Sequence, residues 1–445
     1  MIKKIAFLLL VFNCSISYAQ TIKTDVLVIG DSPSGVSAAM QSARSKMKTV
    51  LIEQREQLCP MLADATTLKF TADRNLPSGI WGEFRKRVKE HYNKTPGYDT
   101  TLNAPLQLEL NVGATILSNV ADTVKDLSIQ LNTSFTNIIK DGDRWEATLT
   151  QNGKTEIIKA RVVIDATENG TVAQKAGATY KPYDNQENKN SPNYYRTSIA
   201  IGDVSPPASY QVDNVNYNYP PYPSYCIPIK AVVAAGVTNL LVTECTLPLK
   251  GNVNYLADQL TLGQGAGVIA AYCAFFKTTT ANLNVRLIQG ELLDFKGYIL
   301  PLADISTDSY WRAIQQVCAT GLIKGVQKKV NGEMQFLFMP DSIVTTAEVK
   351  PVLLEIYTRA FLWFNANKLD KQFTVGNLLS FISELTLTDP DNVKKSMSRD
   401  WNTQYHFISK FDTNSPVTRR EFAILANKFL NPFARTVDLN GRLVN

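Results

Sequence analysis

The chain has few residues of the kinds that build metal centres and nucleophile sites. It contains two histidines in 445 residues, His91 and His406, and neither lies in a motif. Ser–His, Cys–His and histidine-rich metal chemistry all require an imidazole next to a second reactive group. The six cysteines include no C-x-x-C pair, the usual spacing in zinc and iron–sulfur sites. The sequence therefore predicts no metal site.

A hydrophobic run long enough to span a membrane is also missing, because such a helix needs about 20 apolar residues. The first 19 residues instead have the features of a secretory signal. Lys3 and Lys4 precede a short apolar stretch, which ends in the small-x-small site Ser17-Tyr18-Ala19. We expect cleavage before Gln20, export to the periplasm or the outside of the cell, and no transmembrane segment in the mature protein.

Dense clusters of lysine and arginine, which mark nucleic-acid-binding surfaces, are absent as well. The net charge is +6, and Lys3 and Lys4 contribute two of those charges from the segment expected to be removed. We therefore expect no nucleic-acid partner.

Five cysteines remain after cleavage, and this odd number leaves at least one thiol unpaired in an exported protein. The length suits two or three domains with a large core.

The rest of the chain can be placed relative to residues 25–53, which follow the order strand, tight turn, helix, strand, acid. Val26–Ile29 is a short apolar run that stops at Gly30, and Thr49–Ile52 is a second run closed by Glu53. This order is typical of the first unit of a dinucleotide-binding fold. The helix N-terminus offers N–H groups and a positive dipole end to a pyrophosphate, and the acid accepts hydrogen bonds from a ribose.

The turn departs from the G-x-G-x-x-G pattern at its middle position. Its sequence is Gly30-Asp31-Ser32-Pro33-Ser34-Gly35, so Ser32 stands where backbone and phosphate normally touch, and Asp31 adds a negative charge. Two interpretations stay open at this point. One is dinucleotide binding, which the strand–helix–strand–acid context favours, and the other is an α/β unit without a ligand.

The chain has two more apolar runs that we expect to form buried strands, and each precedes a polar or glycine-rich segment. Val162–Asp165 leads into Ala166-Thr167, and Asn239–Val242 precedes Gly263–Gly267, which we expect to open a helix. Between the two strands, residues 180–225 hold nine of the eighteen tyrosines. These tyrosines suit two interpretations: rings packed over loops, or a substrate wall whose rings stack on a ligand.

These blocks together resemble the FAD-dependent oxidoreductases of the glutathione-reductase-like fold. The closest likeness is to a group of exported bacterial members, some of them labelled xanthan-lyase-like. The sequence VVIDATENGTVAQKAGATY is similar to the family's I-D-A-T-x-x-G-D-x-x-x-x-A-G-V-x-Y. The sequences YCIPIKAVVAAGVTNLLVTE and LGQGAGVIAA resemble Y-x-I-P-x-x-x-L-V-x-x-x-x-x-N-L-L-V-x-G-R and L-G-Q-A-A-G-x-A-A-A. The resemblance covers roughly residues 22–295 in separated blocks.

The resemblance implies an α/β fold with an FAD-binding, Rossmann-type domain over residues 20–295 and a small substrate-side insertion at about 180–225. FAD would be the cofactor. Gly30, Ser32 and Gly35 would face the pyrophosphate, and Glu53 would face the AMP ribose. The residues under the cofactor would be Asp165, Ala166 and Thr167. The helix N-terminus near the pyrimidine edge of the flavin would be formed by Gly263, Gly265 and Gly267.

Several positions depart from the family pattern. Cys59-Pro60-Met61 takes the place of the Gly-Gly-Met loop beside the flavin ring, and Thr243-Glu244 replaces Gly-Arg. Asn254 falls where relatives usually carry an arginine. We therefore expect Cys59 near the flavin, either as a redox-active thiolate or as a buried, inert thiol. Arg196 in the tyrosine-rich stretch is the second catalytic candidate, as a guanidinium facing a planar or sugar-like substrate.

Residues 296–445 have a helical pattern and resemble S-layer homology modules. The resemblance lies in Asp304–Gly325 and Met339–Glu348, and the end of the pattern returns as Pro416–Glu421. Thr418 and Glu421 also form a capping box, which a helix start supplies without any function. The tail is thus either a structural helical cap on the flavin domain or a module that contacts envelope glycan.

The sequence as a whole predicts an exported FAD-dependent oxidoreductase that passes hydride or electrons between a small organic substrate and an acceptor. The alternative is a catalytically inactive flavoprotein scaffold that binds envelope or glycan through its tail. No substrate, acceptor or catalytic base is indicated by any motif.

Overall fold

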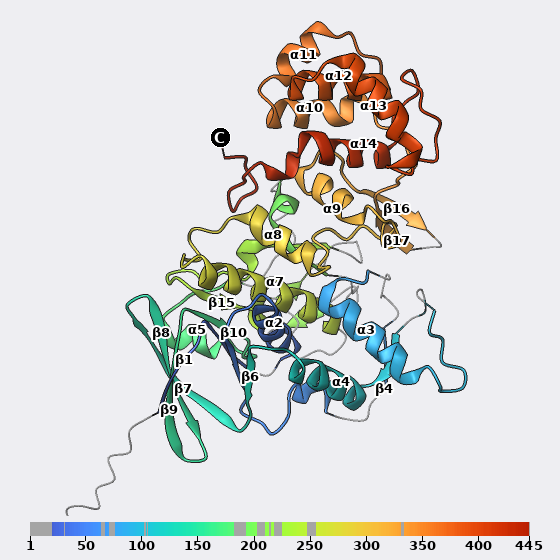
Figure 1. Ribbon diagram of the computed structural model, residues 1–445. Helices are drawn as coiled ribbons and strands as arrows, with labels where there is room; N and C mark the ends of the chain where they lie inside the picture. Colours follow the sequence, from blue (N-terminus) through green and yellow to red (C-terminus); the bar gives the residue numbers. More distant parts are fainter. Residues whose placement is uncertain are drawn as a thin grey trace, which may run out of the picture.

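The computed structural model describes most of the chain after the expected signal segment (Figure 1). The described residues run from 20 to 444, apart from 31, 64–66, 71–75, 102–103, 105, 182–192, 203–209, 213–214, 218–224, 247–254 and 331–332. The signal segment, Asp31, Asn254 and most of the tyrosine-rich stretch therefore lie outside the described residues.

A five-stranded parallel sheet forms the centre of the N-terminal part. Its strand order is β15-β10-β2-β3-β6. The strands are β2 (Val26–Ile29), β3 (Thr49–Ile52), β6 (Leu127–Gln130), β10 (Val162–Asp165) and β15 (Leu240–Val242). Every residue of β2, β3, β10 and β15 is buried, as expected for strands covered on both faces. This confirms the Rossmann-type unit predicted from the apolar runs.

The two faces of this sheet are covered by different elements, because side chains alternate along a strand. Val26 and Val28 face the core that contains helices α2 (Pro33–Arg44) and α7 (Leu256–Phe275). Leu27 and Ile29 face a second core. That core is closed by a four-stranded sheet of order β1-β9-β8-β7. Its strands are β1 (Gln20–Lys23), β7 (Thr133–Asp141), β8 (Arg144–Gln151) and β9 (Lys154–Ala160).

Helix α7 packs directly against α2 and β11, and three glycines make these contacts possible. A Cβ atom at Gly263 would lie 2.1 Å from the Ser34 carbonyl oxygen, and one at Gly267 would lie 2.5 Å from that of Ala38. Gly265 faces strand β11 (Ser198–Gly202) in the same way. The helix begins at Leu256, so the prediction that these glycines open it was wrong. They lie inside the helix, where the absence of side chains lets two backbones approach.

Smaller elements complete the N-terminal part. Helices α3 (Gly79–Tyr92) and α4 (Leu110–Asp122) lie beside a two-stranded antiparallel sheet of β4 (Thr67–Phe70) and β5 (Leu106–Glu109). The others are η1 (Pro60–Leu62), α5 (Thr171–Lys175), η2 (Tyr194–Thr197), β12 (Tyr210–Val212), β13 (Val215–Tyr217), β14 (Tyr225–Pro228), η3 (Ile229–Ala231), η4 (Glu244–Thr246) and α8 (Val285–Asp294). None of the described helices is long and apolar enough to cross a membrane.

The tail is helical, as predicted, and forms the upper part of Figure 1. Helix α9 (Trp311–Thr320) is followed by a hairpin of β16 (Val326–Val330) and β17 (Glu333–Leu337). The later helices are α10 (Thr346–Ile356), α11 (Ala360–Ala366), α12 (Val375–Thr386), α13 (Pro390–Thr403) and α14 (Arg419–Leu425), with short turns at Ala426–Leu430 and Pro432–Ala434. Their core is continuous with the core around α2 and α7.

Three segments of the tail meet in a closed ring of backbone hydrogen bonds. The N–H of Val344 donates to the carbonyl of Val417 at 3.0 Å, and the N–H of Val417 donates to Phe373 at 2.9 Å. The N–H of Phe373 donates back to Val344 at 3.0 Å. Each of these residues directly precedes a threonine that caps the next helix. The tail is therefore a threefold internal repeat of helix pairs.

Two of the three repeats are visible in the sequence. Thr345 and Thr418 each accept an N–H from a glutamate three residues later, and the capping box predicted at Thr418 is confirmed. In the remaining repeat Thr374 caps helix α12 by the same contact, but its partner is Asn377. The substitution of asparagine for glutamate hid this repeat from the sequence pattern.

Candidate cofactor site

The turn after β2 is held by close packing against the end of β10. Gly30 has φ +121°, and a Cβ there would lie 2.4 Å from the backbone of Ala166. The N–H of Ala166 donates to the carbonyl of Ile29 at 2.8 Å. A Cβ at Gly35 would lie 2.8 Å from both the Ala166 Cβ and the Gly30 carbonyl oxygen. Gly30, Gly35 and Ala166 thus fix the geometry of the turn that leads into α2, as the glycine pattern predicts.

Ser32 begins helix α2 as its N-cap. Its Oγ accepts the N–H of Gly35 at 3.2 Å, and its carbonyl accepts the N–H of Val36 at 3.1 Å. This contact satisfies one of the N–H groups that a helix start leaves without a partner. The residue that disrupts the glycine pattern therefore has a structural role of its own. Its backbone remains in the turn where a pyrophosphate would approach, so its contact with the cofactor stays a prediction.

Glu53 follows β3 and is almost completely buried, with 1% of its surface exposed. One carboxylate oxygen, Oε1, accepts the N–H of Arg55 at 2.7 Å. The other, Oε2, is buried without a hydrogen-bond partner among the described residues. A buried carboxylate oxygen in this state is costly, since it has lost water and gained no donor. A ligand hydroxyl would supply that donor, so the residue fits the ribose role predicted for it.

A second acceptor without a partner lies at the end of the neighbouring strand. The Gln130 side-chain oxygen is buried and has no hydrogen-bond partner within the described part of the chain. Gln130 also ends β6, and its backbone carbonyl accepts the N–H of Glu53 at 2.9 Å. Two buried acceptors, Glu53 Oε2 and Gln130 Oε1, therefore lie where β3 and β6 end, each without a donor among the described residues. Adenosine carries both hydroxyl and amino donors, so these residues fit the AMP end of FAD.

Asp165 at the end of β10 is fully engaged by the chain itself. Oδ1 accepts the N–H and the hydroxyl of Thr167, at 3.0 and 2.6 Å, and Oδ2 accepts the N–H of Ala173 at 2.8 Å. Burial raises the pKa of this carboxyl, while the same hydrogen bonds oppose the rise. The Thr167 hydroxyl in turn accepts the N–H of Thr171 at 2.8 Å. Asp165 and Thr167 therefore shape the turn beneath the expected cofactor.

Residues from three distant segments meet at the first turn of α2. Ser34 lies in that turn, and its hydroxyl is 2.9 Å from both Glu244 Oε2 and Thr243 Oγ1. The Gln259 amide of α7 donates to Glu244 Oε1 at 2.8 Å. All four side chains are buried. The sequence had marked Thr243-Glu244 as a departure from the family's Gly-Arg, but gave no indication that the carboxylate lies at α2.

A buried Tyr–Asp pair lies next to this site, at the residue of α7 that directly precedes Gln259. The Tyr225 hydroxyl donates to Asp258 Oδ2 at 2.8 Å. Tyr225 begins β14, and Asp258 lies in the first turn of α7, where the helix dipole favours negative charge. Sequence reasoning had quoted Tyr225 within a motif and had missed Asp258 altogether. A signal was present, since an acid in the first turn of an otherwise apolar helix is notable.

Cys59 occupies a backbone conformation that explains the glycine of its relatives. Its φ is +50°, in the left-handed region, and its side chain is completely buried. Glycine adopts this region without steric cost, whereas a cysteine is strained there. None of the five described cysteines forms a disulfide bond. The position of Cys59 relative to a flavin ring stays a prediction.

Arg196 does not face a substrate, contrary to the prediction. Its guanidinium donates to both oxygens of Glu355, at 2.7 and 2.6 Å, and to the carbonyl of Thr320 at 3.0 Å. A longer contact of 3.3 Å reaches the carbonyl of Gly441. Only 2% of Arg196 is exposed. The side chain joins η2 to the helical tail, and its donors are used in that contact.

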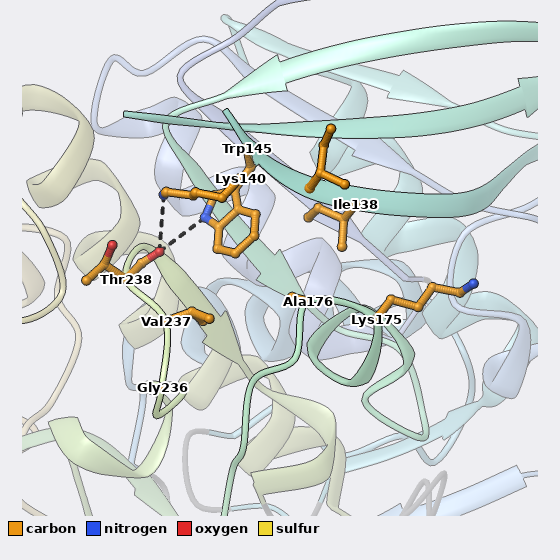
Figure 2. Close-up of a pocket in the computed structure, with 9 residues that line it drawn as sticks. Ile138, Lys140, Trp145, Lys175, Ala176, Gly236, Val237 and Thr238 are labelled. Atoms are coloured by element: carbon orange, nitrogen blue, oxygen red, sulfur yellow. Dashed lines mark hydrogen bonds between the residues drawn. The ribbon is translucent and has the colours of Figure 1, made fainter. Parts of the chain in front are cut away.

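A separate surface hollow of about 550 Å³ lies away from these residues, between the β7–β8 hairpin, α5 and residues 236–238 (Figure 2). The Trp145 indole N–H donates to the carbonyls of Thr238 and Asn239, at 3.2 and 3.0 Å. Lys140 extends over the same indole ring, 4.4 Å from its centre. These contacts attach the hairpin to the loop, and the two lysines at the rim, Lys140 and Lys175, are solvent-exposed. The hollow therefore belongs to the packing between elements.

Comparison with known proteins agrees with this geometry. Residues 25–204 match the family model of FAD dependent oxidoreductase. The matched segment contains the β2–α2 turn, Glu53 and the end of β10, and it supports an FAD-dependent oxidoreductase with FAD as its cofactor. It is less than half of the chain. No curated protein sequence matches the chain at a significant level.

Several solved structures are similar to this chain over part of their length. RebC with bound 7-carboxy-K252c shares 15% identity over 36% of this chain and 35% of its own, with a TM-score of 0.28. p-Nitrophenol 4-monooxygenase PnpA from Pseudomonas putida shares 16% over 36% and 44%, with a TM-score of 0.26. OxyS anhydrotetracycline hydroxylase from Streptomyces rimosus shares 12% over 67% and 73%, with a TM-score of 0.35. The chain thus spans less than half the length of the first two.

Proposed function

We propose that this protein is an exported FAD-dependent oxidoreductase that transfers hydride or electrons between a small organic substrate and an acceptor. The observation that carries the proposal is the Glu53 carboxylate, whose Oε2 is buried without a partner beside the glycine turn. An unpaired buried carboxylate oxygen costs stability, so its presence favours a ligand that donates to it. The family match over residues 25–204 supports FAD as the cofactor, and we propose that its ribose donates to Glu53.

The chain's residues would have distinct roles toward FAD. When bound, the flavin ring of FAD accepts and donates the hydride or electrons. Glu53 would accept hydrogen bonds from the AMP ribose, and Gln130 would accept from the adenine amino group. The positive end of α2, held in place by Gly30 and the Ser32 cap, would face the pyrophosphate. The protein's part in the reaction is thus to bind and orient the cofactor.

The substrate side would lie next to the tyrosine-rich insertion at about 180–225. Tyr225 supports this location, because it is the last residue of the insertion and its hydroxyl donates a hydrogen bond to Asp258 at the start of α7. A buried phenol–carboxylate pair holds a proton between two oxygens, as a group that moves protons must.

The experiment is to isolate the exported protein and record its absorption spectrum before and after anaerobic addition of a chemical reductant. The proposal predicts flavin absorption bands that disappear on reduction and return with an added electron acceptor. A folded, colourless protein that stays colourless after incubation with FAD would overturn it. N-terminal sequencing of the same sample tests export, since a start at Met1 contradicts cleavage before Gln20.

The helical tail supports a second candidate, an inactive scaffold that contacts envelope glycan. Its threefold ring of Val344, Phe373 and Val417 is a repeat architecture that differs from the α/β part, although both share one hydrophobic core. Arg419 beside this ring is used internally, because it donates to Glu348 at 2.6 Å and to the carbonyl of Phe338 at 2.6 Å. Sedimentation of the full-length protein with purified cell-wall glycan tests the candidate. Protein that stays in the supernatant excludes it.

A further inference from the structure

The amino end of α2 is the place where the fold presents positive charge to a pyrophosphate, and it already holds an anion from the chain itself. Glu244 Oε2 is 2.9 Å from the hydroxyl of Ser34, the second residue of the helix. Both side chains are buried, with Glu244 5% exposed and Ser34 fully covered. A carboxylate in this position gains from the helix dipole in the same way as a phosphate oxygen.

Further contacts hold the carboxylate in this place. The Ser34 hydroxyl lies 2.8 Å from that of Ser32, the helix cap, so the serines and the acid form one chain of hydrogen bonds. On the other side, the Gln259 amide donates to Glu244 Oε1 at 2.8 Å. The side-chain oxygen of Gln259, Oε1, is buried and has no hydrogen-bond partner among the described residues. The side chain is thus oriented so that its NH2 group donates to Glu244, while its oxygen is left without a donor. The position of Glu244 is therefore specified by groups on both α2 and α7.

We propose that Glu244 is an internal anion that occupies the amino end of α2 and competes there with the pyrophosphate of the cofactor. This inference rests on the proposed binding of FAD. Because the pyrophosphate is itself negatively charged, it must either displace the carboxylate or remain beside it at the cost of like-charge repulsion. In both cases Glu244 weakens binding of the phosphate-bearing part of the ligand and leaves its uncharged parts unaffected.

The test compares three probes that differ in charge. Inorganic pyrophosphate and ADP carry the phosphates, whereas riboflavin carries none. Glu244→Gln keeps the size of the side chain and its oxygen acceptor while removing the charge. We expect it to bind ADP and pyrophosphate about tenfold more tightly than the wild type, in line with one charge at a helix N-terminus. Binding of riboflavin should not change.

Two further variants separate the contact from general charge and folding effects. Glu168→Gln removes an exposed carboxylate that follows β10 and forms no hydrogen bond or ion pair with α2 in the described part of the chain, so ADP affinity should change less than twofold. Ser34→Ala keeps the charge but removes the hydroxyl that holds it at α2, and should improve ADP binding less than Glu244→Gln does. Thermal melting of each variant verifies folding.

The outcomes distinguish this inference from the proposed function. If Glu244→Gln binds ADP and pyrophosphate no better than the wild type, or more weakly, the competition is refuted and Glu244 is instead a ligand of the cofactor or a purely structural residue. If Glu168→Gln has an equal effect, the influence is general charge and the inference also fails. FAD titration of the wild type decides the proposed function independently, because pyrophosphate binding by Glu244→Gln does not require a flavin site.

Discussion

Arg196 and Glu355 form a two-pronged ion pair that joins the α/β part of the molecule to its helical tail. The two N–O distances are 2.7 and 2.6 Å, and the arginine is buried while the side chain of the glutamate is 40% exposed. Arg196 lies in η2, directly before β11, which packs on α7, and Glu355 lies in α10. The contact therefore links the tail to a described segment within the tyrosine-rich insertion.

Arg196→Ala should destabilise the protein by about 2–3 kcal/mol, because it leaves Glu355 and the Thr320 carbonyl without their donor. This loss of stability is smaller than the loss expected for a fully buried ion pair, because the Glu355 side chain is partly exposed to solvent. Urea denaturation measures the change. Arg87→Ala, which removes an exposed guanidinium on α3, is the control and should change stability by less than about 0.5 kcal/mol. Equal stability of Arg196→Ala and the wild type would show that the pair is not a structural link.

The same pair predicts a pH dependence. The hydrogen bond from Arg196 lowers the pKa of the Glu355 carboxyl below its ordinary value of 4.5. An acid with a lowered pKa in the folded state contributes stability above its unfolded pKa and loses it as the pH falls through the folded value. Stability of the wild type should therefore fall more steeply below about pH 4.5 than that of Arg196→Ala. Parallel acid-denaturation curves would contradict this assignment.

Gly263→Ala should be among the most disruptive single changes in the α/β part. The new Cβ would lie 2.1 Å from the Ser34 carbonyl oxygen, which belongs to the backbone of α2 and cannot move aside easily. We expect a loss of about 3 kcal/mol or more, typical of overpacking between two helices. Gly290→Ala in α8 is the matched control, since no atom lies within 4 Å of its Cβ position. It should stabilise the protein by about 0.5–1 kcal/mol through helix propensity.

Thr374→Ala should cost about 1 kcal/mol through loss of the cap of α12. The Thr374 hydroxyl accepts the N–H of Asn377 at 3.0 Å, and its backbone is bridged to the third repeat. If the three caps are equivalent, Thr345→Ala and Thr418→Ala should have costs of similar size. Differential scanning calorimetry compares them. A negligible effect of Thr374→Ala alone would show that the repeat hidden from the sequence is also the weakest.

The sequence predicted the parts of the fold that depend on local pattern. Apolar runs such as Val26–Ile29 and the acid at Glu53 identify a Rossmann-type unit because strand burial and helix starts follow from neighbouring residues. Local pattern could not place Gly263, since a glycine-rich segment suits both a helix start and a close helix–helix contact. Only the 20-residue length of α7 distinguishes the two.

Contacts between segments that lie far apart in the chain could not be predicted from the sequence. Arg196 was predicted to face a substrate because it is a guanidinium in a tyrosine-rich stretch, and its observed partner Glu355 lies 159 positions away. Glu244 meets Ser34 across 210 positions. Such pairs are fixed by the packing of whole elements, and no local spacing encodes them. The ribose role of Glu53, in contrast, was predicted from its place directly after β3.

The most direct test of the account is a titration of the apoprotein with FAD, comparing the wild type with Glu53→Gln. The amide keeps the acceptor for the Arg55 N–H but removes the charge that the buried Oε2 carries without a partner. We expect saturable FAD binding by the wild type and about tenfold weaker binding by Glu53→Gln, since a hydrogen bond to a charged group is worth roughly 1.5 kcal/mol or more. Unliganded Glu53→Gln should be at least as stable as the wild type. No saturable binding by well-folded wild type, or equal affinities of the two proteins, would contradict the account.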